Sequence, residues 1–239
     1  VTVPEENIFH SYTSEETMRT RMLDFAESSV TDQKILVISD QANTDAEASI
    51  LQRFPASELV DLREEEENIS LDVEDLQSKL SEEVENWVFV ETDDFKIASS
   101  VVSILNSSNS DTTRIRMLTT SQNRAFENEV VPATHLSNLR FTFPSVYRDR
   151  MDPGFVRRYR RRFGGDPDRY AARGFDLTMD LALRLAYKPD LFQVADQLGE
   201  TEYSANKFNY VKPLQSGYFN IASYILMYDG LRITEAELP

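Results

Sequence analysis

The sequence predicts an α/β protein built on a doubly wound, mostly parallel sheet of five strands. Between residues 31 and 145, short β-branched runs alternate with helical patterns, which is typical of βαβ units with helices on both faces. The chain has 239 residues, of which 41% are hydrophobic, enough for the core of one large domain or two small lobes. After residue 145 two helical patterns follow each other without a strand. We therefore expect one unit over residues 1–145 and another over 146–239.

Each expected strand is a short apolar or β-branched run bounded by polar or turn-forming residues. The runs 34–39 and 87–92 are almost continuously apolar, as strands covered on both faces should be. The five expected strands are 34–39, 58–62, 87–92, 115–119 and 138–143.

Apolar residues at helical spacing predict the helices around these strands. A helix over residues 14–26 precedes the first strand, with Met18, Met22 and Phe25 on one face and Ser14 as its N-cap. The other helices are expected over 45–54, over 71–84 with Ser70 as N-cap, over 93–105 with Asp93 as N-cap, and over 124–130.

The second unit is expected to begin with helices over 152–163 and 166–186, separated by Gly164 and Gly165. Asp166 suits the N-cap of the later helix. One stripe of that helix should face an apolar partner: Tyr170, Gly174, Leu177, Leu181 and Leu185. Aromatic and β-forming residues between 208 and 233 predict a few strands near the C-terminus.

The composition argues against several classes of function. A formal net charge of −16 disfavours nucleic acids and anionic membranes as partners. The chain has no cysteine, two separate histidines (His10 and His135) and seven glycines, and it contains no phosphate-binding glycine motif. Enzyme chemistry is therefore not expected, nor is a cofactor or a metal. For adjacent carboxylates such as Asp93 and Asp94, a role as helix caps is favoured over a role as acid–base catalysts.

We interpret two charged runs of the sequence as ordinary solvated surface and not as binding sites. The four acids from Glu64 to Glu67 lack the ordered spacing of a calcium loop, so a solvated loop is favoured over a cation site. The basic cluster lies on the helix over 152–163, and a solvated face is favoured there over an anion or nucleic-acid patch. Its members are Arg157, Arg158, Arg160, Arg161 and Arg162.

Compartment does not follow from the residues themselves. No stretch approaches the roughly 18 apolar residues of a membrane-spanning helix. The N-terminal residues lack the basic and apolar regions of a signal peptide, and Val1 is an unusual natural start, so we expect a processed or excised polypeptide.

One motif in the second unit resembles a known family. Phe155, Tyr159 and Phe163 recur every four residues and are followed by Gly164, Pro167, Tyr170-Ala171 and Gly174-Phe175-Asp176. This run resembles the F-x3-Y-x3-[FY]-G-x2-P-x2-Y-A-x2-[GA]-[FY]-D helix pair of type I periplasmic binding proteins of the Leu/Ile/Val-binding kind. The order of the preceding βα units and the C-terminal strands is also similar, so the resemblance covers most of the chain.

The resemblance implies two Rossmann-like lobes joined by three crossovers, with a small polar ligand between them. Residues 1–145 would be the second lobe, and residues 146–239 an incomplete first lobe and crossover whose opening βα units are missing. The apolar stripe of the helix over 166–186 would then need another partner, and a homodimer is one expectation. The aromatic tail is similar to the variety fused to LysM repeats. The resemblance also implies a cell-envelope or periplasmic location.

Ligand-binding residues are expected beyond the carboxyl ends of the strands, where loops and helix N-termini meet in open α/β sheets. Polar residues at these places suit an amino-acid-like ligand, although each of them is also a natural helix cap. The candidates are Ser39, Asp40, Thr92, Asp93, Thr119, Thr120, Ser121, Ser145 and Tyr147.

Three functions remain open. The first is a solute-binding domain, as in ABC-transporter-linked amino acid transport, that passes its ligand to a membrane transporter or sensor. The second is a protein–protein interaction module of the envelope on the same scaffold, with an apolar patch near Tyr159, Tyr170 and Leu177. The third is an enzyme, which turnover dependent on Asp40 or Asp93 would favour. Fold similarity alone does not decide between them.

Overall fold

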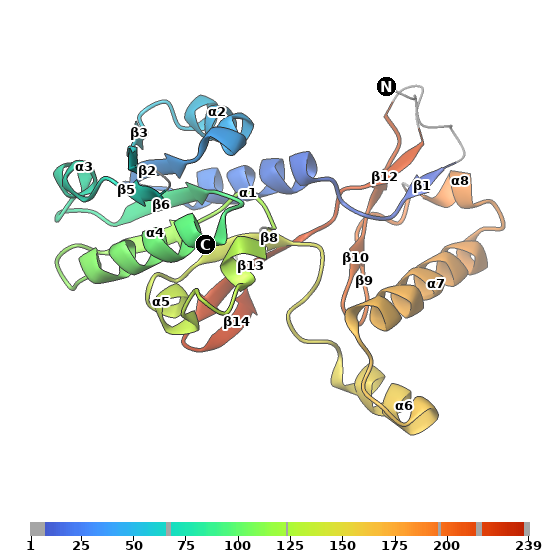
Figure 1. Ribbon diagram of the computed structural model, residues 1–239. Coiled ribbons are helices and arrows are strands. Elements are labelled where there is room, and N and C mark those ends of the chain that lie inside the picture. The colour runs from blue at the N-terminus through green and yellow to red at the C-terminus, as the bar shows by residue number, and fades with distance from the viewer. Residues whose placement is uncertain (1–7, 66–67, 123, 196, 214–216, 237–239) are drawn as a thin grey trace. The chain divides into compact units, whose positions relative to one another are not determined.

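The computed structural model describes residues 8–65, 68–122, 124–195, 197–213 and 217–236 and has a mixed α/β fold (Figure 1). The chain divides into two compact units. The helix-pair unit contains the described residues up to Met18 and residues 145–224, and the sheet unit contains residues 19–144 and those from 225 onward. The chain therefore passes between the units three times. The boundary expected near residue 145 is one of these passages.

A seven-stranded sheet forms the centre of the sheet unit, in the order β14-β13-β8-β7-β6-β2-β3. The neighbours from β8 to β3 pair in parallel, and β13 pairs with β14 antiparallel. The sheet is thus mostly parallel, and it has seven strands where five were expected, because two C-terminal strands extend it. Its strands are β2 (Lys34–Ser39), β3 (Glu58–Leu59), β6 (Asn86–Glu91), β7 (Ile115–Leu118), β8 (Thr142–Ser145), β13 (Tyr224–Asp229) and β14 (Arg232–Glu235).

Both faces of this sheet are covered, because successive side chains of a strand point to opposite sides. On one face, Ile38 and Val90 belong to a cluster with Val101 of α4, and on the other, Val37 and Phe89 pack with residues of α1 and α2. Buried apolar strands therefore hold the layers together. The helices of this layer are α1 (Glu15–Ser29), α2 (Thr44–Arg53), α3 (Val73–Lys79), α4 (Phe95–Ser108) and α5 (Ala133–Asn138), with 3-10 turns at Gln41–Asn43 and Arg124–Glu127.

A β-hairpin lies where the sequence predicted an acidic loop and the start of a helix. Strand β4 (Leu62–Glu65) pairs antiparallel with β5 (Asn68–Leu71), and Glu66 and Glu67 lie outside the described residues. The expected N-cap Ser70 is a strand residue, and Asp72 caps α3 by accepting the N–H groups of Glu74 and Asp75. The prediction was wrong here because Leu71 is buried as a strand residue, so the helix begins after it.

Other element boundaries also differ from the prediction. The strand expected over 58–62 is only Glu58–Leu59, and the helix expected over 124–130 is a 3-10 turn at Arg124–Glu127. Strand β8 begins at Thr142, whereas 138–143 was expected, because α5 continues to Asn138 and Arg140 turns the chain with a positive φ of 46°. Helix α4 is capped by Asp94, which accepts the Lys96 N–H at 2.7 Å, and Asp93 is exposed beside it. The N-cap is therefore one position later than expected, and α4 begins at Phe95.

The helix-pair unit contains helices and two small sheets. Its three-stranded sheet has the order β1-β12-β11, with β1 parallel to β12, and a two-stranded sheet pairs β9 with β10. Helix α6 ends at Gly164, which has the left-handed φ of 80° that favours glycine. The elements are β1 (Phe9–His10), α6 (Pro153–Phe163), α7 (Arg169–Tyr187), α8 (Leu191–Val194), β9 (Thr201–Glu202), β10 (Lys207–Phe208), β11 (Tyr210–Val211) and β12 (Tyr218–Asn220).

Helix α7 faces its unit mainly with a polar side, so the expected apolar stripe is only partly turned inward: Leu177 packs against the core of the unit and Leu181 is half-buried. Asp176, Asp180 and Arg184 are fully buried, whereas Tyr170 and Leu185 of the expected apolar stripe are exposed. Asp180 and Arg184 form an ion pair, and Asp176 accepts the N–H groups of Ser204 and Ala205, which lowers the cost of removing these charges from water. The predicted cap also shifts: Asp168 caps α7 through the Ala171 N–H, while Asp166 pairs with Arg160.

Candidate functional site

The carboxyl ends of β2, β6 and β7 carry a connected group of polar side chains. These strands are parallel neighbours, so their ends meet at one edge of the sheet. Thr92 follows β6 and donates its hydroxyl hydrogen to the Asp40 carboxylate at 2.5 Å. Asp40 follows β2 and also accepts the Ala42 N–H at 3.0 Å and the Asn43 amide at 2.9 Å. Two predicted residues, Asp40 and Thr92, are therefore in direct contact.

Glu91 is the most unusual residue of this group. It ends β6 and is only 1% exposed. One carboxyl oxygen accepts the Thr120 N–H at 2.6 Å, and the other lies 3.4 Å from the Thr119 hydroxyl, which donates to it. Two predicted ligand residues, Thr119 and Thr120, therefore donate hydrogen bonds to the carboxyl group of Glu91 at this edge of the sheet.

Burial raises the pKa of Glu91 from 4.5 to about 7. The hydrogen bonds from Thr120 and Thr119 and the positive charge of Arg19 act against this increase, and burial outweighs them. The Nε atom of Arg19 is buried and has no hydrogen-bond partner within the described residues. A buried carboxyl group that titrates near neutral pH beside an arginine is typical of functional sites, and it also occurs in structural networks.

A third acidic group lies at the same edge. Ser39, the last residue of β2, donates its hydroxyl hydrogen to the carboxylate of Glu47 in α2. Ser121 is partly exposed and Asp93 is exposed at this end of the sheet, so both are accessible to solvent. Within the described ranges, no three acidic or histidine side chains are arranged to hold a metal ion.

Ser145 and Tyr147 belong to the helix-pair unit and form a local turn. The Ser145 hydroxyl donates to the Tyr147 carbonyl oxygen at 2.8 Å and accepts the Tyr147 N–H at 3.1 Å. The Tyr147 ring lies 6.0 Å from the guanidinium of Arg169 and 5.9 Å from that of Arg173. The Ser145 hydroxyl is therefore engaged in the turn, while the Tyr147 ring contacts cations.

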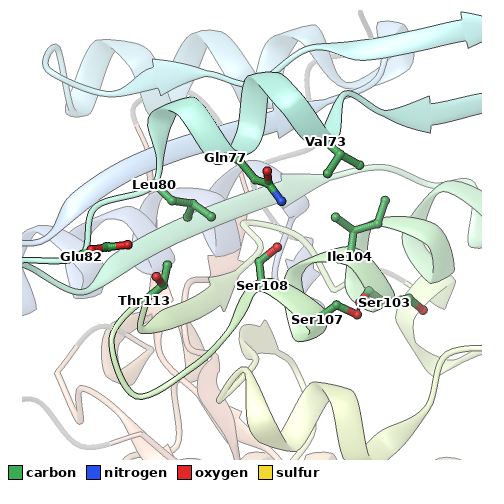
Figure 2. A pocket seen from close by; sticks show the side chains of 9 residues that line it. All are labelled: Val73, Gln77, Leu80, Glu82, Ser103, Ile104, Ser107, Ser108 and Thr113. Carbon is green, nitrogen blue, oxygen red and sulfur yellow. Dashed lines mark hydrogen bonds between the residues drawn. The ribbon is translucent and has the colours of Figure 1, made fainter.

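A separate open groove runs between α3 and α4, with a volume of about 570 Å³ (Figure 2). Side chains from the two helices line its two sides, and Glu82 and Thr113 lie at one end. The groove contains none of the predicted ligand residues. Its lining mixes small hydroxyls such as Ser103 and Ser107 with Leu80 and Ile104, so it has no concentrated charge.

Sequence reasoning missed Glu91, Glu47 and Arg19. A signal for Glu91 was present, because a glutamate directly follows the apolar run 87–90 inside an expected buried strand. No comparable signal marked Arg19 or Glu47, because both lie outside the apolar positions that predicted their helices.

No family model, curated protein or solved structure matches the chain. None of the helices in the described part of the chain is long and apolar enough to cross a membrane.

Proposed function

We propose that this chain is a non-catalytic ligand-binding domain of the type I periplasmic-binding-protein kind, acting in a bacterial cell envelope or periplasm. The observation that carries the proposal is the path of the chain, which passes three times between two units. Three crossovers between two lobes are what the resemblance implies. The helix motif around Tyr159 and Asp176 supports the same family.

In this proposal the sheet unit is the doubly wound second lobe, and the helix-pair unit is an incomplete first lobe. The small sheets of the helix-pair unit have strands of two or three residues. Such short strands support a reduced lobe in place of a second wound sheet.

The ligand is proposed to be an amino acid or a similar small polar molecule at the carboxyl edge of the sheet. Hydroxyl and carboxyl groups gather there on three neighbouring strand ends, around Asp40, Glu91 and Thr120. Carboxylates bind ammonium groups, and the partly exposed Ser121 and exposed Asp93 can reach solvent. Asp40 already accepts three hydrogen bonds, which suits a positioning role more than catalysis. A membrane transporter or sensor would recognise the ligand-bound conformation of the domain.

A thermal-shift screen with amino acids, short peptides and sugars tests the proposal. A ligand that binds only the native state stabilises it by about 2.7 kcal/mol at 100 times its dissociation constant. We expect at least one compound to raise the Tm, and Thr92→Val to weaken that effect because it removes the hydrogen bond to Asp40. Thr31→Val, an exposed change before the opposite end of β2, is the matched control. A chain that no compound stabilises would contradict the proposal.

A second candidate function is an envelope interaction module on the same scaffold. The exposed apolar side chains of α7 favour it, because contiguous apolar surface on a water-soluble unit marks contact sites. The two functions differ in their test. Ligand-dependent stabilisation supports the first, and an interface that maps to α7 supports the second.

A further inference from the structure

Helix α7 has a polar side that is fully used within its own unit. Asp180 accepts hydrogen bonds from Arg184 at 2.8 Å, from Thr201 at 2.8 Å and from Tyr203 at 3.0 Å. Asp176 accepts two backbone N–H groups and the Asn206 amide. Arg184 also donates to the carbonyl oxygen of Ala195. These three charges anchor the segment after α8, so this side of the helix is not available to a partner.

The outward side of α7 consists of two neighbouring rows at four-residue spacing. One row has large apolar side chains that are 36–67% exposed: Phe175, Met179, Leu183 and Tyr187. Phe175 is the least free of them, because its ring also contacts that of Phe155 in α6, with 4.8 Å between the centroids. The adjacent row has small residues that are all exposed: Gly174, Thr178, Ala182 and Ala186. The Thr178 hydroxyl donates to the carbonyl oxygen of Gly174 at 2.7 Å, so its hydrogen-bonding need is met inside the helix. A ridge therefore runs beside a shallow groove over about three turns.

None of these eight residues carries a charge, although 28% of the chain is charged and its net charge is −16. A ridge beside a groove at four-residue spacing is complementary to a copy of itself, since helices pack by placing such ridges into such grooves. An isologous contact also needs a surface that does not repel its own copy. An uncharged face meets that condition on a strongly acidic chain.

We propose that two copies of this chain form a two-fold dimer through the outward face of α7, defined by the two rows from Gly174 to Tyr187. The ridge of each copy lies in the groove of the other. The contact is one helix wide and smaller than the about 800 Å² per partner of a standard interface. The dimer therefore dissociates on dilution. This inference does not rest on the proposed ligand, because all of its residues belong to the helix-pair unit, whereas Asp40, Glu91 and Thr120 belong to the sheet unit.

Sedimentation velocity of the 239-residue chain over a concentration series tests the dimer. We expect the mass to rise from that of one 27.5-kDa chain to that of two as concentration increases. Ala182→Glu places a charge in the groove and should raise the dissociation constant at least about 100-fold, because an unpaired buried charge is strongly unfavourable. Leu231→Glu is the control, since Leu231 is 74% exposed at a turn of the sheet unit and its change should leave dimerisation intact.

The absence of cysteine allows a second measurement of the same contact. Ala182→Cys introduces a single thiol near the middle of the face, where a two-fold axis brings it close to its own copy. A short bis-maleimide should cross-link this variant and should not cross-link Leu231→Cys. A circular-dichroism melt of each variant checks that it is folded. A wild-type chain that stays monomeric at every concentration overturns the proposal, as does a dimer that folded Ala182→Glu leaves unchanged.

Discussion

Replacing Glu91 with glutamine is expected to make folding stability less dependent on pH. Burial raises the pKa of Glu91 in the native state from 4.5 to about 7. An acid whose native pKa is raised contributes stability that is fully present below pH 4.5 and is lost as pH rises through 7. Glutamine can still accept the Thr120 N–H, and it has no proton to lose, so the variant should not show this loss.

The size of the effect follows from the two pKa values. The difference between 4.5 and about 7 corresponds to about 3 kcal/mol at 1.36 kcal/mol per pKa unit. About 2 kcal/mol of this falls between about pH 5.5 and pH 8.5, because the unfolded glutamate is already mostly ionised at the lower pH. This window lies above the sequence pI of about 4.6, so the chain keeps a net charge that limits aggregation.

Urea unfolding of both proteins across this window is the assay. The free energy of unfolding of the wild type should fall relative to that of Glu91→Gln by about 2 kcal/mol as pH rises. Asp93→Asn, an exposed change on the neighbouring loop, should alter stability by less than about 0.5 kcal/mol at either pH. Parallel pH curves for wild type and Glu91→Gln would refute the reasoning, because they would mean that Glu91 titrates alike in the native and unfolded chains.

Two other substitutions test the local structure. Asp94→Ala should destabilise the chain by about 1 kcal/mol in urea unfolding because it removes the N-cap of α4. Asp93→Ala should destabilise the chain by less than about 0.5 kcal/mol. A larger loss for Asp93→Ala than for Asp94→Ala would mean that Asp93 is the N-cap. Arg184→Ala should destabilise by about 3–5 kcal/mol, since it leaves Asp180 buried without its cation, and a loss below about 1 kcal/mol would contradict the buried pair.

Much of the sheet could be predicted because its strands carry their own signal. The runs at β2 and β6 are apolar almost without interruption, so their burial does not depend on which helices cover them. Boundaries were less predictable where two residues compete for one role. Asp93 and Asp94 are adjacent and equally suited to cap a helix, and only the backbone path after Thr92 selects Asp94.

The candidate site was predicted in part for the same reason. Asp40, Thr92, Thr119 and Thr120 were placed at strand ends by the sheet pattern, and the parallel pairing of β2, β6 and β7 brings those ends together. Glu91 follows an apolar run inside an expected buried strand, but that pattern alone does not give the partners that would bind its carboxyl group. Its burial depends on Thr119 and Thr120, which are about 28 residues away along the chain.

By itself the sequence determined the α/β class, the buried strands and the strong acidity, because these follow from composition and local periodicity. Only the tertiary structure decided which side of α7 faces inward. Periodicity shows that polar and apolar residues lie on different sides of that helix, and burial of the apolar side is the default expectation. The polar side packs inward because Asp176, Asp180 and Arg184 find partners in residues 195–206, and such partners become neighbours only when distant segments fold together.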